Sequence, residues 1–266
     1  MSSDSATHLA QRIAVRYGTM SEVEAVVLGG SRSSTLSDGH SDIDLYVYVS
    51  EMMSLDQREQ AAVLAKRAEI GNNFWEPGDE WIDDETGISV DVMFRTTRWI
   101  EEQLDRVLRQ HEASVGYSTC FWYNVRNSRS LFDRVGWFAK IQAIACQPYP
   151  EQLKRAIIAK NHPILRNTMS SYMHQLELAR ERHDPVSVNH RLGALLASYF
   201  DILFAINEQP HPGEKRLISF AELLCPKRPP QLAENVTRVL VDPTPAHLNA
   251  LLDGLDAALR KENLLP

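Results

Sequence analysis

The stretch VEAVVLGGS at residues 23–31, followed by DIDLYVYV at residues 42–49, decides the fold of this chain. The first is an apolar, β-branched run that ends in two glycines, so it predicts a buried strand and a tight turn. In the second stretch, polar or aromatic residues alternate with aliphatic ones, which predicts another strand. Between them, residues 31–41 are rich in Ser, Asp and Gly, which leaves room for a loop and one helical turn.

Further elements are predicted on both sides of this stretch. The apolar run ISVDVMF at residues 88–94 predicts a third strand, and residues 6–17 predict a short amphipathic helix. We expect helices at residues 55–70, with Ser54 as the N-cap, and at residues 97–112. Residues 71–85 are expected to form a hairpin or an irregular insert.

The pattern changes near Tyr149 and Pro150, after which prolines separate segments that are almost only helical. Helices are expected at residues 151–160, 164–182, 186–207 and 214–224, followed by two more. We therefore predict an α+β chain, with a mixed-sheet domain at residues 1–148 and an all-α helical-bundle domain at residues 149–266.

The bulk composition narrows the class of protein. The chain has 266 residues and a net charge of −7, which weighs against a nucleic-acid partner and suits a cationic small molecule. Its three cysteines are far apart and have no zinc-ligand spacing, so they predict neither a disulfide framework nor a zinc site. No signal peptide or membrane span is evident, so we expect a cytoplasmic protein without a membrane partner.

Three carboxylates point to the chemistry. Asp42 and Asp44 are two residues apart on a predicted strand, so their side chains share one face. Asp91 lies among apolar residues of another predicted strand and needs a partner there. If the two strands are neighbours, all three carboxylates converge, and a divalent cation such as Mg²⁺ would relieve their repulsion. The turn at Gly29 and Gly30 would bring backbone amides close to a phosphate.

The order of these features resembles the signature of the DNA polymerase β-like nucleotidyltransferase superfamily, over roughly residues 23–94. The resemblance implies that Gly30 and Ser31 hold the triphosphate of a nucleotide. It also implies that Asp42 and Asp44 ligate Mg²⁺. Asp91 matches the third carboxylate, which in many members ligates metal and assists deprotonation of the attacking hydroxyl. Residues 1–148 would then be the nucleotidyltransferase domain.

The helical second half of this acidic chain is similar to the small-molecule branch of that superfamily, typified by aminoglycoside and lincosamide nucleotidyltransferases. This resemblance implies transfer of a nucleoside monophosphate, AMP from ATP by default, to a hydroxyl of a small acceptor. The helical domain would bind the acceptor and close over the site, and the role would be antibiotic resistance or housekeeping. The sequence leaves the nucleotide, the acceptor and the choice between monomer and homodimer open.

Several further residues are candidates for binding. Arg32, next to Ser31, and Lys215 are expected to contact the triphosphate, with Lys154 and Lys160 as alternatives. Asp201, in a nearly apolar helix, is either an acceptor-binding carboxylate or general base, or a structural carboxylate paired with a residue such as Arg191. The acidic and aromatic residues 74–85 predict either a pocket for a cationic acceptor or an exposed hairpin whose aromatics pack inward.

Three other functions remain open. A protein-modifying, antitoxin-type enzyme would place AMP on a polypeptide. A non-enzymatic nucleotide-binding module would have no need of three carboxylates. A template-independent RNA or tRNA nucleotidyltransferase is disfavoured by the net charge of −7 and the lack of a basic stripe.

Overall fold

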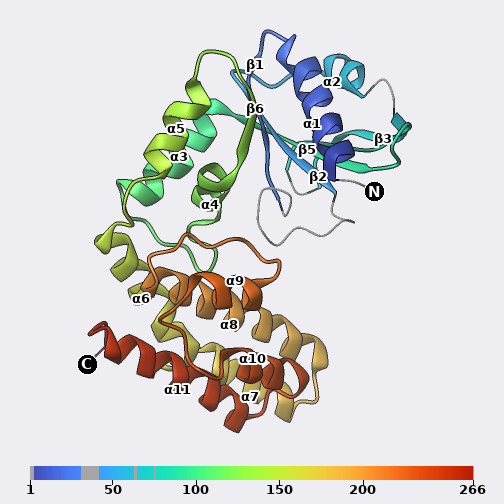
Figure 1. Cartoon of the computed structure of the whole chain (residues 1–266). Helices are drawn as coiled ribbons and strands as arrows, with labels where there is room; N and C mark the ends of the chain where they lie inside the picture. Colours follow the sequence, from blue (N-terminus) through green and yellow to red (C-terminus); the bar gives the residue numbers. More distant parts are fainter. Residues whose placement is uncertain (1–2, 31–41, 63–64, 75, 266) are drawn as a thin grey trace. The chain divides into compact units, whose positions relative to one another are not determined.

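The structure of the chain is a computed structural model that describes residues 3–30, 42–62, 65–74 and 76–265 (Figure 1). The chain divides into two compact units. Unit 1 comprises Met1–Leu104 and Asn124–Gln147, and unit 2 comprises Asp105–Tyr123 and Pro148–Pro266. Unit 1 contains a mixed sheet and unit 2 is helical, so the predicted α+β class is confirmed. Residues 105–123, which we expected in the first domain, belong to unit 2.

Unit 1 is built on a six-stranded sheet with the strand order β3-β4-β5-β2-β1-β6. Strands β2 and β5 are parallel, and the other neighbouring pairs are antiparallel. The elements of this part of the chain are α1 (Ser3–Gly18), β1 (Val23–Leu28), β2 (Ile43–Val49), α2 (Leu55–Ala61), β3 (Ala65–Asn72), β4 (Gly78–Asp83), β5 (Ser89–Thr96), α3 (Thr97–Leu108), α4 (Cys120–Asn127), β6 (Arg129–Asp133) and α5 (Trp137–Ala145).

The two faces of the sheet pack against different helices. Helix α1 buries Leu9, Ile13 and Tyr17 in a core with the apolar side chains of β1, β2 and β5. On the other face, the ring of Tyr48 in β2 stacks on Phe138 of α5, with 5.7 Å between ring centroids. Because side chains alternate along β2, this second face is also the face of Asp44.

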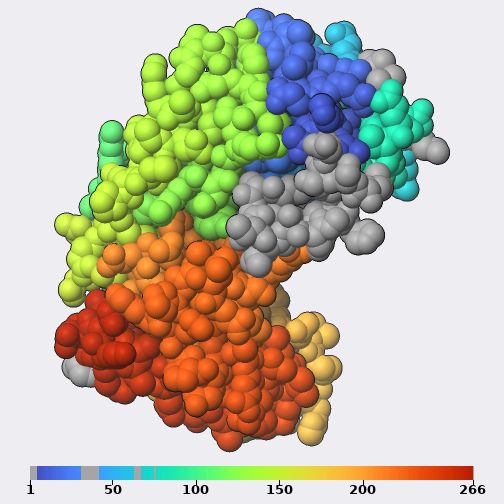
Figure 2. Space-filling view, in the orientation of Figure 1, coloured from blue at the N-terminus to red at the C-terminus, as the bar shows by residue number. Residues whose placement is uncertain are grey.

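The turn after β4 is tied to α1. Arg12 Nη2 donates to Asp83 Oδ1 at 3.2 Å, and Asp83 Oδ2 accepts from the backbone N–H and the hydroxyl of Thr86. The space-filling view shows α1, in dark blue, beside the hairpin of β3 and β4, in teal (Figure 2). These contacts hold the β4–β5 turn and therefore the start of β5 in place.

The predicted helix at residues 55–70 is wrong in its second half. Ser54 is the N-cap of α2, as predicted, and forms a capping box with Gln57, but the helix ends at Ala61. Residues from Ala65 onward form the edge strand β3, which pairs with β4. Pairing with β4 has overridden the helix propensity of the Ala, Lys, Arg and Glu residues in this segment.

Two other features differ from the sequence-based expectation. The chain after α4 forms strand β6 and helix α5, which no pattern in that segment predicted; β6 pairs with β1 at the edge of the sheet. Helix α6 continues through Pro163, where a break was expected. A proline inside a helix removes one hydrogen bond, and burial of Leu165 in the core of unit 2 favours continuing the helix.

Unit 2 is a set of helices around one apolar core. The long helix α8 buries its second half there, including Tyr199, Leu203 and Phe204. No helix in the part of the chain that the structure describes is both long and apolar enough to cross a membrane. The helices that follow unit 1 are α6 (Glu151–Arg166), α7 (Tyr172–Glu181), α8 (Pro185–Ile206), α9 (Leu217–Leu224), α10 (Leu232–Val241) and α11 (Pro245–Lys261).

A buried polar cluster explains why residues 114–119 belong to unit 2. Asp201 of α8 accepts hydrogen bonds from the backbone N–H of Ser118, at 3.0 Å, and from its hydroxyl, at 2.6 Å. Asn161 of α6 accepts from the backbone N–H of Gly116 at 2.9 Å. Asp201 is 1% exposed, and this burial raises its pKa to about 7.

The raised pKa of Asp201 predicts a pH dependence of stability. An unfolded Asp has a pKa of about 3.9, so between about pH 4 and pH 7 the folded state retains a proton that the unfolded state releases. Stability should therefore fall as the pH rises through this window. Asp201→Asn imitates the protonated carboxyl, so its free energy of unfolding in urea should fall less than that of the wild type between pH 5 and pH 8. Equal changes in both proteins would contradict the pKa assignment.

Candidate functional site

Asp44 and Asp91 lie directly opposite each other in the parallel pair formed by β2 and β5. Neighbouring strands are about 4.8 Å apart, so paired side chains on one face are adjacent. Both aspartates are half-buried, whereas Ile43 and Val90, the pair before them, are buried on the other face of the sheet. The structure thus brings together two of the three predicted carboxylates.

Asp42 immediately precedes β2 and is exposed. Within residues 3–30, 42–62, 65–74 and 76–265, no group of three or more His, Cys, Asp or Glu side chains is arranged to hold a metal ion. The described part of the site is therefore a pair of carboxylates with Asp42 nearby in sequence. Two carboxylates provide the hard oxygen donors that Mg²⁺ prefers, and this cation commonly completes its shell with water and substrate phosphates.

The glycine turn after β1 is folded onto the side chains of β2. The backbone N–H of Gly29 donates to the carbonyl oxygen of Asp44 at 2.9 Å. Gly30 has φ +61, and a Cβ at this position would lie 1.7 Å from Oδ2 of Asp44. A Cβ at Gly29 would lie 2.3 Å from Cε2 of Tyr46. Both positions therefore require glycine, because the backbone itself occupies the space next to Asp44 and Tyr46.

For the other residues predicted to bind the nucleotide, contact with the triphosphate stays a prediction. Ser31 and Arg32 lie outside the described residues. Lys215 is an exposed residue of unit 2 that precedes α9, and its contact with the triphosphate stays a prediction. Lys154 is 8% exposed and its Nζ is bound by Glu151, at 2.5 Å, and by Glu208, at 2.9 Å. The ammonium group of Lys154 is thus paired with two carboxylates within unit 2.

Asp201 forms hydrogen bonds with Ser118 instead of pairing with Arg191. Its neutral partners and nearly complete burial favour the structural interpretation over the acceptor-binding one. The acidic residues at positions 74–85 do not form one pocket either. Asp79 is buried in an ion pair with Arg58, Glu76 is paired with Arg95, and Phe74 is 82% exposed.

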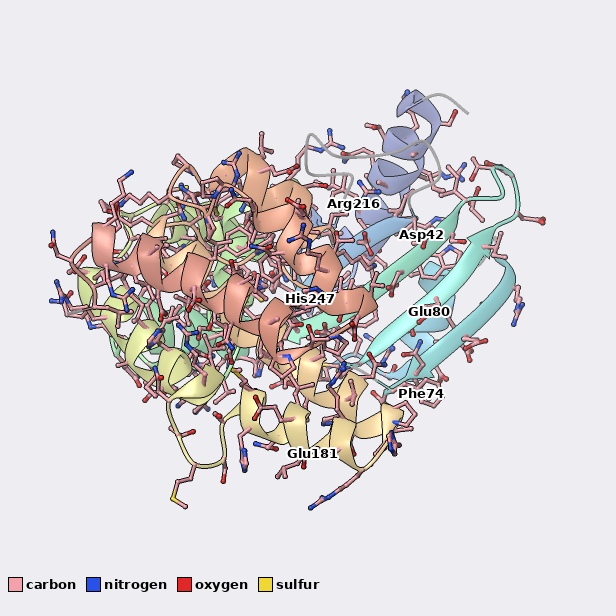
Figure 3. All side chains as sticks on the ribbon, turned by 90° about the horizontal axis from the view of Figure 1, so that it is seen from below. Asp42, Phe74, Glu80, Glu181, Arg216 and His247 are labelled. Atoms are coloured by element: carbon pink, nitrogen blue, oxygen red, sulfur yellow. The ribbon has the colours of Figure 1, made fainter. Side chains whose placement is uncertain are left out.

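Glu80 is the member of this segment that joins the site face. In the register of the sheet, Glu80 of β4 lies opposite Asp91, and Glu69 of β3 lies opposite Glu80. Asp44, Asp91, Glu80 and Glu69 therefore form one row across four neighbouring strands, which we name the acidic row. Glu80 is exposed and accepts a hydrogen bond from Asn72 at 3.3 Å. Figure 3 labels Asp42 and Glu80 on the sheet, with Phe74 beyond Glu80 toward the far end of the strands.

Sequence reasoning missed Tyr46 and Arg95, which share the face of the two aspartates. The guanidinium carbon of Arg95 lies 4.1 Å from the centroid of the Tyr46 ring. Burial raises the pKa of Tyr46 to about 12, with opposing effects from the charges of Arg95 and Asp44. Tyr46 is thus a neutral phenol at physiological pH. The alternation that places Asp91 on this face also places Arg95 there, which was the available signal.

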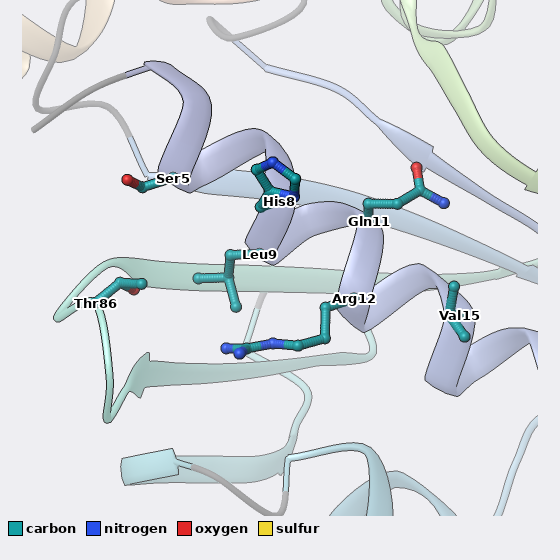
Figure 4. A pocket seen from close by; sticks show the side chains of 7 residues that line it. All are labelled: Ser5, His8, Leu9, Gln11, Arg12, Val15 and Thr86. Carbon is teal, nitrogen blue, oxygen red and sulfur yellow. The ribbon is translucent and has the colours of Figure 1, made fainter.

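A separate hollow lies over α1 and the β4–β5 turn (Figure 4). It is lined by Ser5, His8, Leu9, Gln11, Arg12, Val15 and Thr86. Leu9 belongs to the core that includes Ile43 and Val90, so this hollow is on the side of the sheet opposite to Asp44 and Asp91. It is therefore not part of the candidate site.

Comparisons with known proteins add little to this geometry. No protein-family model matches the sequence, and a search among curated proteins finds no match. Among solved structures, a nucleotidyltransferase-like protein from Exiguobacterium sibiricum 255-15 is similar, with 12% identity and a TM-score of 0.45, over 96% of this chain and 75% of that chain. This likeness is too loose to indicate an activity.

The close approach of Gly30 to Asp44 predicts a large effect of Gly30→Ala on stability. Gly87→Ala is a matched control, because Gly87 has φ +67 and a Cβ there would have no atom within 4 Å. The control should lose about 1 to 2 kcal/mol, the cost of a left-handed conformation for a residue with a side chain. Gly30→Ala should lose clearly more in urea unfolding. The excess should shrink when Asp44 is also replaced by Gly, and an unchanged excess would contradict the clash.

Proposed function

We propose that this chain is a metal-dependent nucleotidyltransferase, which transfers a nucleoside monophosphate, AMP from ATP by default, to a hydroxyl of a small molecule and releases pyrophosphate. The observation that supports it best is the pair Asp44 and Asp91, in register on adjacent parallel strands, with the glycine turn packed directly on Asp44. Two carboxylates beside a glycine turn bring acidic groups and a closely approaching backbone into one place. The complex of a nucleoside triphosphate with a divalent cation would bind to both: the cation to the carboxylates and the phosphates to the backbone of the turn.

The nucleotide would be held at the glycine turn. Gly30 has no side chain and a left-handed backbone, so a phosphate can approach the main chain closely after β1. In this proposal Ser31 and Arg32, which follow in the sequence, donate to the triphosphate, and Lys215 is proposed to add a positive charge. The contact of Ser31 is implied by the resemblance in sequence, Arg32 is included because it follows Ser31, and Lys215 is a further candidate from the sequence; all three are part of the proposal.

The chemistry would be an in-line displacement. The acceptor oxygen forms a bond to the α-phosphorus, the bond from the α-phosphorus to the bridging oxygen breaks, and pyrophosphate leaves. The proton of the acceptor hydroxyl passes to the carboxylate of Asp91. The protein contributes mainly by positioning the two reactants and by electrostatic stabilisation.

The donor set on this face suits a magnesium ion. Asp44 and Asp91 provide adjacent carboxylates that would hold Mg²⁺ together with phosphate oxygens, and Asp42, which precedes the same strand as Asp44, is proposed as a third ligand. When bound, the cation neutralises negative charge on the α-phosphate and on the leaving pyrophosphate. Adjacent carboxylates repel each other, and a cation between them removes that cost.

The acceptor is proposed to be a small cationic molecule, such as an aminoglycoside-like compound. The acidic row continues from Asp91 to Glu80 and Glu69, away from the glycine turn, so it offers carboxylates to a cationic group on that side of Asp91. An amino group of the acceptor would pair with Glu80 while its hydroxyl reaches the α-phosphate. The net charge of −7 for the whole chain agrees with a cationic acceptor.

The activity is tested by pyrophosphate release with Mg²⁺, each of the four ribonucleoside triphosphates, and a panel of aminoglycosides, lincosamides and other polyhydroxylated compounds. We expect acceptor-dependent release that Asp44→Asn and Asp91→Asn reduce by about a hundredfold or more, as expected for residues at the reacting atoms. Chelation of the cation should abolish the release. Circular dichroism must show that both variants are folded.

Two results would change the proposal. If nucleotide binds with Mg²⁺ but no small acceptor supports pyrophosphate release, the acceptor is not one of these small molecules, and transfer of labelled nucleotide to polypeptides should be tested next. If the folded Asp44→Asn variant is fully active, the site is misassigned.

Glu80→Gln tests the acceptor assignment. The variant should raise KM for a cationic acceptor about tenfold, as expected for the loss of one charged hydrogen bond, and leave KM for an uncharged polyhydroxylated acceptor unchanged. Asp84→Asn is a matched control, because Asp84 is an exposed carboxylate on the turn after β4, outside the acidic row. An equal effect of both substitutions would show that the overall charge, not Glu80, attracts the acceptor.

A further inference from the structure

The ring of Tyr46 packs against the glycine turn at Gly29 and Gly30. A Cβ at Gly29 would meet three atoms of one edge of this ring, Cε2 at 2.3 Å, Cδ2 at 3.0 Å and Cζ at 3.2 Å. The main chain of Gly29 is therefore in direct contact with the ring. Gly30, the next residue, is in contact with the carboxylate of Asp44, two residues before Tyr46 on the same face of β2. Two side chains of one strand thus define where the turn lies.

Tyr46 is in turn held by an ion pair. The Arg95 guanidinium lies over its ring, and Arg95 makes a bidentate pair with Glu76, from Nε to Oε2 at 2.8 Å and from Nη2 to Oε1 at 2.9 Å. Arg95 is 5% exposed. A planar guanidinium bound by two hydrogen bonds has little freedom to move, and it fits flat against an aromatic ring.

These contacts form a continuous series from Glu76 to Arg95, to Tyr46 and to Gly29. Its members come from the segment before β4, from β5, from β2 and from the turn after β1. The series thus connects four separate parts of unit 1 on the face of Asp44 and Asp91. A buried charged group such as Arg95 needs a partner. Burial alone does not explain why the pair of Arg95 and Glu76 lies next to the ring that contacts the glycine turn.

We propose that Arg95, fixed by Glu76, is a positioning residue that acts through Tyr46 to hold the Gly29–Gly30 turn in the position needed to bind a triphosphate. This inference rests on the proposed nucleotidyltransferase activity. Arg95 touches no reacting atom in this scheme. Its loss should weaken nucleotide binding and leave the chemical step and the metal-binding carboxylates intact.

The sheet offers a matched control on its opposite face. Arg58 is also buried, also pairs with a carboxylate, with Nε at 3.0 Å from Asp79 Oδ2, and also lies over a ring, 4.3 Å from the centroid of Phe94. Phe94 shares the apolar face with Val90 and Val92, away from the glycine turn. Arg58→Lys and Arg95→Lys therefore remove the same kind of interaction, but only Arg95 lies over a ring that contacts the glycine turn.

The experiment measures the dissociation constant of the Mg²⁺ complex of whichever ribonucleoside triphosphate the wild type binds, by calorimetry, together with KM and kcat in the pyrophosphate assay. Arg95→Lys should raise the dissociation constant and KM for the nucleotide about tenfold with little change in kcat. Arg58→Lys should change neither by more than about twofold at a similar loss of thermal stability. Tyr46→Phe keeps the ring and should bind like the wild type, whereas Tyr46→Leu should behave like Arg95→Lys.

The outcomes separate this inference from the proposed function. If the wild type binds nucleotide and the two arginine variants weaken binding equally, Arg95 has only a structural role and the inference is overturned. If the wild type binds none of the four triphosphates, the proposed function itself fails. Should Arg95→Lys not fold, Glu76→Gln is the milder variant: it retains the guanidinium over Tyr46 but weakens its anchor, and unchanged nucleotide affinity there would also overturn the inference.

Discussion

The parallel pairing of β2 with β5 is the constraint on which the rest of unit 1 depends. Apolar side chains of both strands, such as Leu45 and Val92, fix the register from one face by packing under α1. Because side chains alternate with a period of two, the same register places Asp44 beside Asp91 on the other face. A slip of one residue would send a carboxylate into the core. Ordinary hydrophobic packing therefore determines the position of the charges.

The site face combines groups that are costly to place together. Two neighbouring carboxylates repel each other, and the guanidinium of Arg95 is buried on the same face, four residues beyond Asp91 on β5. The charge of Arg95 is balanced by its ion pair with Glu76, and the guanidinium of Arg95 lies over the neutral ring of Tyr46. The glycine turn completes the arrangement, because a side chain there would displace either the carboxylate or the ring.

Much of this could be predicted from the sequence, and the reasons for the rest are physical. Strands β2 and β5, which hold Asp44 and Asp91, and strand β1 have strong apolar patterns, and the Ser54 cap is a local signal, so these elements were predictable. Strand β3 was predicted as helix because its residues favour helix locally and become a strand only by pairing with β4. The contact of Arg95 with Tyr46, and the position of Glu80 beside Asp91, depend on strand order, which local patterns do not contain.

The course of the chain has a consequence for how unit 1 is made. The chain leaves this unit after Leu104 and returns at Asn124, and only then supplies β6, whose Arg129 pairs with Leu28 of β1. A ribosome would thus deliver every carboxylate of the acidic row well before the strand that closes the edge of β1. Until then β1 presents unsatisfied amides and carbonyls, which is a state prone to mispairing with other chains. No single cut in the polypeptide can separate the two units, so neither is a simple module that recombination could transfer whole.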